Sequence, residues 1–500
     1  MRLGDRALLW ACAVLAAAAA GIAFFHYMPD DAWLQLRYAR NLAAGEGMVF
    51  NPGEPVEGYS GFLWIVILAS AARLGLPLAA TARVSGLLLS IAALPAAAAA
   101  AASRPRGPGG GRTDPAALFA APLVIAASIP WAVWAMSGSE VPLYTFLAAA
   151  GTALVVRRRP AAAQAAVFSL LALVRWEGLL LLGASLVIAA SGERGRREAL
   201  RGAGVAALLL VPYAAWKVWW FGSLVPNRVY AASGPPAVML RNGLVYAGGF
   251  LARYGWIAAA GTAMAGRDGL RERRILVPLA FVALLLIAAV ASGGDPSPQY
   301  RLLVPAVVLS AVILAAGLDR LVMRLGTARA APTVLAVAFA FAVMVPGSLS
   351  HDTVRRERVT VEAFARLGGR LGAILPPGAV IACGSTGAIG FHSGLRVIDI
   401  LGYTEPVIAR EGRAVSTEPG RMKSLGARVM AARPDLLLLG NIQIHRGERD
   451  EDRGRIKPQE RDILEQPLFI ERYRFVNLPI GGGFYLSCYA REGADLSGPP

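Results

Sequence analysis

Residues 161–190, AAAQAAVFSLLALVRWEGLLLLGASLVIAA, form an apolar stretch whose fold is decided by Arg175–Gly178 near its middle. A charged side chain at the centre of a bilayer costs about 2.5–3.5 kcal/mol on insertion scales. A single helix would also put the arginines at 157–159 and those within 194–201 on opposite sides of the membrane, although basic loops favour the cytoplasmic side. The stretch therefore predicts two short helices joined by a hinge at the outer face.

The whole sequence has the composition of a membrane protein. Of its 500 residues, 56% are hydrophobic and only 17% are charged, whereas soluble chains carry roughly 25% charged residues. The net charge of +17 does not indicate nucleic-acid binding, because many of the arginines lie in short loops between apolar runs. Three cysteines exclude a disulfide framework, and we expect Cys383 and Cys488 to be unrelated free thiols. The composition leaves a polytopic membrane protein with one water-exposed domain.

Apolar runs recur along residues 1–350. The run at about 7–25 lacks a clear cleavage site, so we expect a retained first span with a cytoplasmic N-terminus. The run at 61–72 is too short to span and predicts an interfacial helix within a first outer loop at 26–80. About eleven spans result, which places the C-terminus outside. Besides the two halves of 161–190, the later spans are expected at about 81–102, 116–136, 141–156, 203–221, 244–265, 275–291, 302–322 and 331–348.

Residues 351–500 have the mixed pattern of an α/β domain, which the topology places outside the membrane. The segment is large enough to have its own core. Residues 442–465 are charged and predict a surface loop. Helices are expected at 356–375 and 421–433, and strands at 379–383, 396–400, 436–439, 468–478 and 483–492.

Polar residues that packing alone does not require gather in the loops expected to face outward. Each has a structural alternative: Asp30 and Asp31 could cap a helix, Arg175 and Glu177 could form an interfacial ion pair, and the other polar loops could be turns. It is their convergence on one face that favours a functional site. The candidate residues are Asp30, Asp31, Glu57, Tyr59, Glu140, Arg175, Glu177, Lys217, Asn227, Asp295 and Arg301.

The chemistry of these side chains suggests a transfer reaction at a membrane surface. A carboxylate can accept a proton from a hydroxyl nucleophile. Arginine and lysine near the outer leaflet can bind a phosphate, arginine in a bidentate manner. A hydroxyl nucleophile and a phosphate leaving group together describe transfer from a lipid-phosphate donor.

Several motifs in order along the chain resemble those of bacterial integral-membrane glycosyltransferases of the GT-C superfamily. The longest is residues 29–64, PDDAWLQLRYARNLAAGEGMVFNPGEPVEGYSGFLW. The pattern is most similar to the mycobacterial terminal arabinofuranosyltransferase family, and more distantly to the aminoarabinose transferase of lipid A and protein O-mannosyltransferases. Two positions depart from it: Trp176 replaces a usual proline, and Arg421 stands where a histidine often follows Gly420. Further matches are SGSEVPL (137–143), RWEG (175–178), FGSLVPN (221–227), GGD with YRLLVP (293–305) and VIDILGYTEPVIAR (397–410).

The resemblance implies a GT-C fold and a polyprenyl-phosphate sugar as donor, with inversion at the anomeric carbon. It implies an acidic base in the first outer loop, for which Asp30 is the first candidate and Asp31 the second. Arg175, Arg301 and Lys217 are implied as phosphate ligands. A divalent cation remains possible, with no ligand set indicated. The residues expected to hold sugar or acceptor hydroxyls are Glu57, Tyr59, Glu140, Glu177, Asn227 and Asp295.

The expected acceptor is a hydroxyl of a cell-envelope glycan or glycolipid at the outer face of the bacterial cytoplasmic membrane. Arabinofuranose and mannose are the sugars considered. The Gly-rich stretch GSTGAIG (384–390) imitates a dinucleotide fingerprint, but no acidic residue clearly follows at the required spacing, which disfavours a nicotinamide cofactor. Two other functions remain open: a polytopic transporter or flippase of lipid-linked sugars, and a noncatalytic relative that binds glycan.

Overall fold

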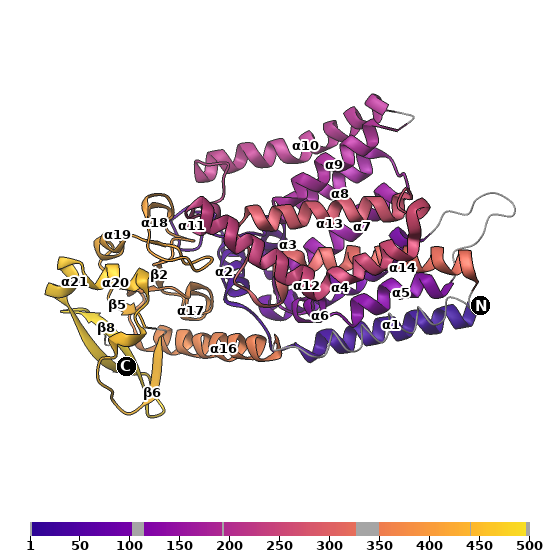
Figure 1. The fold of residues 1–500 in the computed structure, drawn as a ribbon. Coiled ribbons are helices and arrows are strands. Elements are labelled where there is room, and N and C mark those ends of the chain that lie inside the picture. The colour runs from indigo at the N-terminus through magenta and orange to yellow at the C-terminus, as the bar shows by residue number, and fades with distance from the viewer. Residues whose placement is uncertain (1–2, 103–114, 193–194, 327–349, 441, 497–500) are drawn as a thin grey trace.

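The computed structural model describes residues 3–102, 115–192, 195–326, 350–440 and 442–496. Long helices run side by side at one end of the molecule, and a mixed α/β domain lies at the other (Figure 1). The helices before the domain are α1 (Leu3–Ala23), α2 (Asp30–Ala44), α3 (Phe62–Arg73), α4 (Leu78–Ala101), α5 (Pro115–Ala126), α6 (Ile129–Ala135), α7 (Val141–Val156), α8 (Ala161–Val174), α9 (Glu177–Ala190), α10 (Gly195–Phe221), α11 (Asn227–Ala232), α12 (Pro236–Gly269), α13 (Arg273–Ala291), η1 (Pro298–Leu303) and α14 (Val304–Leu325).

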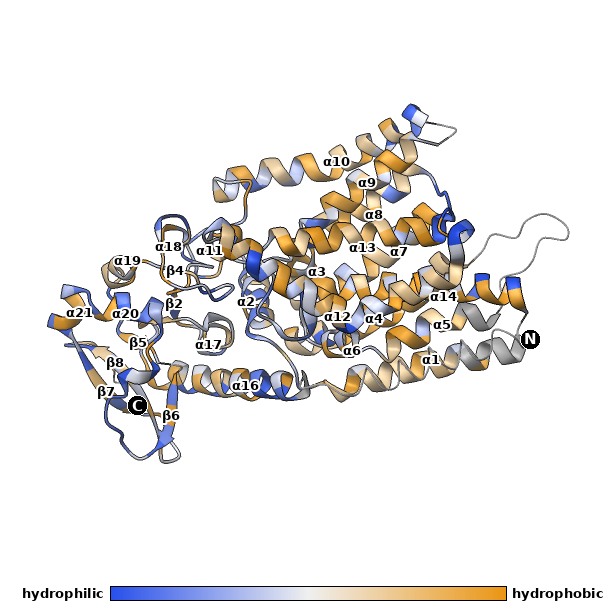
Figure 2. Cartoon of the chain, viewed as in Figure 1, coloured by the Kyte–Doolittle hydropathy of each residue, from blue (hydrophilic) through white to orange (hydrophobic). Residues whose placement is uncertain are grey.

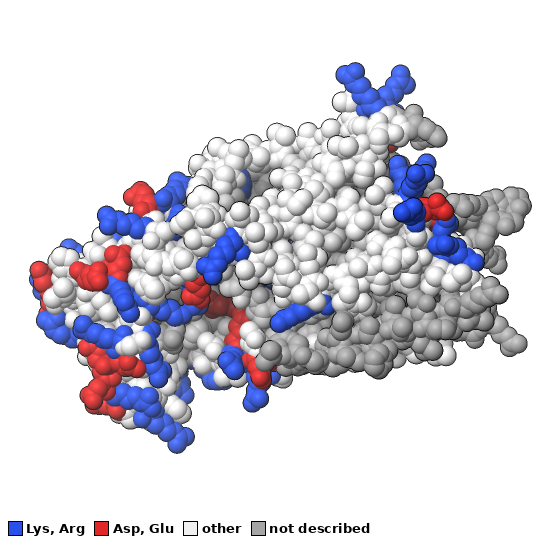
Figure 3. Space-filling model, viewed as in Figure 1, with Lys and Arg blue, Asp and Glu red and all other residues white. Residues whose placement is uncertain are grey.

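The helical bundle has the surface of a membrane protein. Apolar residues dominate its helices in Figure 2, and on the face shown in Figure 3 the charged side chains gather at the two ends of the molecule, with an uncharged band between them. Four described helices are long and apolar enough to cross a membrane, and five shorter apolar helices accompany them. The predicted total of about eleven spans stays a prediction, because the expected span at 331–348 lies outside the described residues.

The predicted hinge in the 161–190 stretch is confirmed, since α8 ends at Val174 and α9 begins at Glu177. Arg175 has the extended backbone of a strand, with φ −151° and ψ 138°. A Cβ added at Gly178 would collide with the backbone of Leu171 and Ala172, so the two helices fold back on each other closely only because this residue is glycine. The hinge places Arg175 between the two helices and Glu177 at the first residue of α9, so neither charge lies in the middle of an apolar helix.

The prediction of a single span at 116–136 is wrong. The chain forms α5 and the short α6 instead, with Ser128 extended between them. The physical reason is Pro130, whose ring would clash with the carbonyl of the residue four positions earlier if α5 continued. Pro130 instead occupies the first turn of a new helix, where proline is tolerated.

The C-terminal domain is built on a six-stranded sheet in the order β2-β1-β5-β8-β6, with β7 paired to β8. β1 pairs in parallel with β2 and β5, whereas β8 is antiparallel to its partners. Successive residues of β1 face opposite cores: Ile381 packs with the cluster that includes α16 and α17, and Ala382 with the cluster under α19 and α20. The strands of this sheet are β1 (Val380–Cys383), β2 (Arg396–Asp399), β5 (Leu436–Leu438), β6 (Gln443–Arg446), β7 (Tyr473–Pro479) and β8 (Phe484–Arg491).

The remaining elements of the domain correct three details of the sequence prediction. The helix expected at 421–433 is limited to α19, because Lys423–Ser424 pairs with Arg413–Ala414 as a short sheet. The strand expected from 468 begins only at Tyr473, since Pro467 starts a helical turn. The expected loop at 442–465 contains β6 and a helix, because β6 completes the sheet beside β8. The helices are α16 (Ser350–Ile374), α17 (Thr386–Ser393), α18 (Pro406–Glu411), α19 (Gly426–Ala431), η2 (Arg453–Arg455), α20 (Pro458–Leu464) and α21 (Pro467–Arg472), and the short sheet is β3 (Arg413–Ala414) with β4 (Lys423–Ser424).

The first outer loop joins the bundle to the C-terminal domain. The buried Arg37 donates to the carbonyls of Phe50 (2.7 Å) and Leu395 (2.8 Å). Asn51 donates to the carbonyl of Val397 at 3.0 Å, which ties the same loop to β2. α2 therefore carries its aspartates between the membrane helices and the domain.

Candidate active site between the helices and the C-terminal domain

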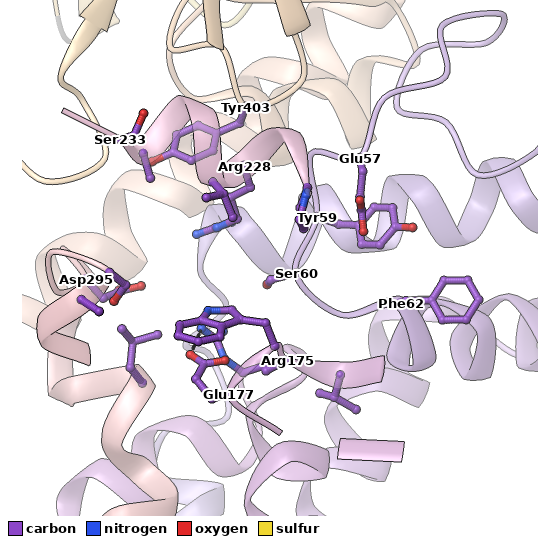
Figure 4. A pocket seen from close by; sticks show the side chains of 18 of the residues that line it. Glu57, Tyr59, Ser60, Phe62, Arg175, Glu177, Arg228, Ser233, Asp295 and Tyr403 are labelled. Carbon is purple, nitrogen blue, oxygen red and sulfur yellow. Dashed lines mark hydrogen bonds and ion pairs between the residues drawn. The ribbon is translucent and has the colours of Figure 1, made fainter. Parts of the chain in front are cut away.

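A cavity of about 680 Å³ lies where the bundle, the first outer loop and the C-terminal domain meet. Figure 4 shows side chains from all three parts directed toward it, with Arg175 and Glu177 opposite Arg228 and Tyr403. The sequence candidates that line it are Glu57, Tyr59, Arg175, Glu177, Lys217, Asp295 and Arg301.

The α8–α9 hinge supplies one ion-pair cluster. Arg175 pairs with Glu140 at 2.9 Å and with Glu177 at 3.0 Å. Glu140 also accepts hydrogen bonds from Gln35 (2.7 Å) and Ser60 (2.9 Å). The extended backbone at Arg175 points its guanidinium toward these carboxylates. Arg175 therefore forms the ion pair that was its structural alternative, and it also lines the cavity.

The 3-10 turn before α14 supplies a second cluster. Arg301, only 2% exposed, pairs with Asp31 at 2.6 Å and donates to Asp295. Asp31 also pairs with Arg228 of α11 at 2.8 Å. Two guanidinium groups thus share the carboxylate of Asp31, and the Asp31 side chain is 30% exposed. Although burial raises the pKa of Asp31, the charges of Arg228 and Arg301 outweigh it and hold the pKa below its ordinary value.

A third pair closes the side of the cavity toward α10. Lys217 lies 2.9 Å from Glu57, and the hydroxyl of Tyr213 donates to the same carboxylate at 3.4 Å. Burial raises the pKa of Glu57 to about 7, and the charge of Lys217 offsets only part of that rise. Glu57 is therefore a carboxyl group that exchanges its proton close to neutral pH.

The two aspartates of the first outer loop have different surroundings. Asp30 accepts hydrogen bonds from the backbone N–H groups of Gly387 (3.0 Å) and Ala388 (2.8 Å) in the first turn of α17, and it does not line the cavity. Burial raises the pKa of Asp30 to about 6 despite these two bonds. Asp31 does not line the cavity either, but it is ion-paired to Arg228 and Arg301, which do. The ion pairs therefore connect Asp31, and not Asp30, to the cations of the cavity, and the choice between them as base stays a prediction.

The Gly-rich stretch at 384–390 is accounted for by the same contact. In a dinucleotide site, the backbone N–H groups at the start of α17 would bind a phosphate. Here they donate hydrogen bonds to Asp30 instead. A Cβ at Gly387 would collide with the carbonyl oxygen of Asp30. The glycines therefore permit close approach of the chain's own α2.

The remaining candidates divide between the cavity and its frame. The Tyr59 hydroxyl is buried and has no hydrogen-bond partner among the described residues. Asn227 donates to the carbonyls of Gly402 and Tyr403, both at 2.8 Å, so it holds the C-terminal domain against α11. Asn227 and Glu140 act behind the cavity wall, where the sequence had placed them in contact with substrate.

The sequence reasoning missed several residues of the cavity. Arg228 directly follows the FGSLVPN motif (221–227) and is one of the polar residues that flank this turn, but the sequence analysis gave it no role. Tyr403 lies in the VIDILGYTEPVIAR motif, and its ring stacks under Arg228 at 5.2 Å. Ser60, Gly420 and Met422 also line the cavity. Ser60 lies in the motif at 29–64 and Gly420 precedes Arg421, but neither was given a role, and no pattern in the sequence distinguished Met422.

The chemistry available to the site is that of paired charges. Its four cations, all ion-paired to carboxylates of the same site, are Arg175, Lys217, Arg228 and Arg301. No group of three or more His, Cys, Asp or Glu side chains in the described part of the chain is arranged to hold a metal ion. Buried cations of this kind can bind a phosphate if the phosphate displaces one of the carboxylates that are ion-paired to them.

Comparison with known proteins supports this architecture. Residues 352–489 match a family model described as a domain of unknown function, DUF8728. The chain resembles the crystal structure of ArnT from Cupriavidus metallidurans bound to undecaprenyl phosphate, with a TM-score of 0.60, 15% identity and 100% of both chains covered. The apo structure of the same protein gives a TM-score of 0.58 with 15% identity and covers 99% of each chain. No curated protein matches.

The fold is therefore that of a multi-pass helical membrane protein of the ArnT-like, GT-C type with a β-containing C-terminal domain. This confirms the predicted fold class. The likeness does not reach to the narrower arabinofuranosyltransferase family.

Proposed function

We propose that the protein transfers a sugar from a polyprenyl-phosphate donor to a hydroxyl of a cell-envelope glycan or glycolipid at the outer face of the cytoplasmic membrane. The observation that carries the proposal is the cavity, where buried arginines and a lysine meet carboxylates directly above apolar helices. The ArnT structure of the same fold is bound to undecaprenyl phosphate, which supports a donor of this class.

The walls of the cavity suit both ends of such a donor. Leu179 and Leu224, which line it, are 49% and 60% exposed, as suits side chains that face lipid. The cations lie deeper, with Arg301 2% exposed and Lys217 6% exposed. An apolar polyprenyl chain would enter along the leucines and place its phosphate among the cations, where low dielectric strengthens the attraction.

Phosphate binding and activation of the base would be coupled through Asp31. Arg228 and Arg301 share its carboxylate, so a phosphate that binds these guanidinium groups competes with it. Arg175 and Lys217 remain candidate phosphate ligands, each initially held by a carboxylate. The displaced Asp31 would lose the charges that depress its pKa and become the better proton acceptor.

The proposed reaction is a direct displacement with inversion. Asp31 accepts the proton of the acceptor hydroxyl while that oxygen bonds to the anomeric carbon. The bond from the anomeric carbon to the phosphate oxygen breaks, and its electron pair leaves with the polyprenyl phosphate. Glu57, Tyr59, Glu177 and Asp295 line the cavity and are proposed to hold sugar hydroxyls. Arabinofuranose and mannose remain the candidate sugars.

The test is sugar transfer by the purified protein in lipid nanodiscs. Donors are polyprenyl-phosphate arabinofuranose and polyprenyl-phosphate mannose, each with a pooled envelope-glycan acceptor, with and without EDTA to test for a divalent cation. Asp31→Asn should lower the rate by about 10²-fold or more, as loss of a general base does. Asp30→Asn is the matched control, because this adjacent carboxylate accepts backbone hydrogen bonds from α17 and does not pair with the arginines of the cavity, and it should retain measurable transfer.

The outcomes separate the proposed enzyme from its alternatives. Loss of transfer in Asp30→Asn with wild-type transfer in Asp31→Asn would restore Asp30 as the base. Consumption of neither donor, with labelled donor still bound, would favour a transporter or a noncatalytic glycan-binding protein, and a flipping assay would distinguish those two.

A further inference from the structure

A second cavity, of about 290 Å³, lies within the C-terminal domain. It is placed at the carboxyl ends of the three parallel strands: Gly384 follows β1, Ile400 follows β2, and Leu438 ends β5. β2 and β5 lie on opposite sides of β1, so the strand order reverses here. Ligands of open α/β sheets bind at such a position, and the proposed transfer reaction has not used it.

One buried polar atom in the lining of this cavity has no hydrogen-bond partner among the described residues. Gln459 is 2% exposed, and its Oε1 has no hydrogen-bond partner among the described residues, while its Nε2 donates to the carbonyl of Arg421 at 2.6 Å. A buried amide oxygen without a partner destabilises the folded state, because its lost hydrogen bonds to water are not replaced. A ligand hydroxyl or bound water in the cavity would satisfy it.

Two cations also line the cavity. Lys457 forms no ion pair with a carboxylate of the described residues, and Arg421 pairs only with the exposed Glu418, at 3.5 Å. The one carboxylate in the lining, Glu460, is already engaged, because it accepts from the backbone N–H groups of Lys457 (2.7 Å) and Gly440 (3.2 Å). The lining thus carries two cations and one carboxylate, an excess of one positive charge, which favours an anionic ligand.

The rest of the lining suits a sugar ring. Hydroxyl groups from Thr360 and Ser385 lie beside apolar side chains from Phe364, Leu401 and Ile442. A pyranose or furanose has an apolar face and a polar edge, so this mixture of walls matches it better than it matches a free inorganic anion.

The second cavity shares walls with the candidate active site. Arg421 lines the second cavity, whereas its neighbours Gly420 and Met422 line the first. Likewise, Leu401 lines the second cavity and Tyr403 lines the first. The Tyr403 hydroxyl donates to the carbonyl of Gly420 at 2.8 Å. A ligand held in the second cavity therefore contacts the two segments that form the domain's side of the active site.

We propose that the second cavity is an acceptor subsite that binds a sugar bearing an anionic substituent, either phosphate or carboxylate, with Arg421 and Lys457 as its cationic ligands. The proposal rests on the proposed transfer function for its role, and on the cavity alone for binding. It adds a recognition site outside the active-site cavity and gives the C-terminal domain a part in choosing the acceptor.

Binding is tested on the full chain in nanodiscs without donor, by isothermal titration with mannose 6-phosphate, glucuronic acid, mannose and inorganic phosphate as probes. We expect one of the two anionic sugars to bind at least about tenfold more tightly than mannose and than phosphate. Arg421→Gln and Lys457→Gln should each weaken it by about tenfold. Lys457→Arg should retain binding, and Arg449→Gln, an exposed arginine of the same domain, should leave it unchanged.

Transfer kinetics separate this proposal from the transfer function. Arg421→Gln should raise the KM for an anionic acceptor and leave the KM for the donor unchanged. Anionic-sugar binding that is lost in Lys457→Gln supports the subsite even if no donor is consumed. No binding of either anionic sugar, or equal binding in Arg421→Gln, Lys457→Gln and wild type, would overturn it even if transfer is active.

Discussion

At the scale of single residues, neighbours in sequence have opposite surroundings. Asp30 accepts backbone hydrogen bonds from α17, whereas Asp31 lies between two guanidinium groups. Glu57 has one cation, Lys217, and is otherwise desolvated. The pKa of each carboxyl group therefore depends on how many cations lie beside it to offset the effect of burial.

Glu57 should give the reaction a pH dependence near neutrality. Burial raises the pKa of Glu57 to about 7, so below that pH the group is neutral and its ion pair with Lys217 weakens, which frees Lys217 for the donor phosphate. The KM for the donor should therefore rise as the pH increases through about 7. The Glu57→Gln variant should lose this inflection, and an unchanged profile in that variant would assign the titration to another group.

Gly178 should be the least replaceable residue of the hinge. A Cβ there would collide with the backbone of α8, so Gly178→Ala forces the two helices apart and should cost about 1–3 kcal/mol, as overpacking does. Gly183→Ala in the same helix is the control, because a Cβ at Gly183 meets nothing within 4 Å. Thermal unfolding in detergent, followed by intrinsic fluorescence, compares them. Equal stability of both variants would contradict this account of the hinge.

At the scale of elements, α2 and α17 hold the two parts of the molecule together. The carboxylate of Asp30 lies at the N-terminus of α17, which is the positive end of the helix dipole. Arg37 and Asn51 extend the same junction to the chain around β2. These contacts explain why the first outer loop is long and polar although only part of it lines the cavity.

The Asp30 contact should make stability depend on pH. The pKa of Asp30 is raised from 3.8 to about 6 in the folded protein, so the folded state binds a proton more tightly than the unfolded state. The stabilisation of the folded state by the protonated Asp30 is therefore fully present below about pH 4, and it is lost as the pH rises through 6. Between pH 7 and pH 5 the unfolding midpoint of wild type should rise relative to that of Asp30→Asn. A difference that does not vary with pH would rule out this role.

At the scale of the whole molecule, the charged side chains on the face shown gather at the two ends, and the apolar helices lie between them (Figures 2 and 3). The start of α10 and the turn from α12 to α13 lie at the end opposite the C-terminal domain (Figure 1). The basic residues of these segments predict that this end is cytoplasmic, and hence that the domain and the candidate active site face outward.

Cysteine labelling in intact spheroplasts tests that orientation. Cys383 and Cys488 are buried and Cys12 is exposed, so Cys12→Ala provides the background. In that background Arg449→Cys, in the C-terminal domain, should react with a membrane-impermeant maleimide. Arg158→Cys, in the loop between α7 and α8, should react only after permeabilisation. The reverse pattern would invert the topology and the proposed side of the reaction.

The sequence by itself determined the features that depend on local composition. Apolar runs and arginine-rich loops predicted a membrane bundle, and Arg175–Gly178 predicted the hinge, because the cost of burying charge in a bilayer acts at each position separately. The tertiary structure decided the partners: which aspartate pairs with the arginines of the cavity, that Arg228 and Tyr403 line it, and that a second cavity lies beside it. Those facts depend on where α11, α17 and the sheet pack, and packing joins residues hundreds of positions apart that no local pattern relates.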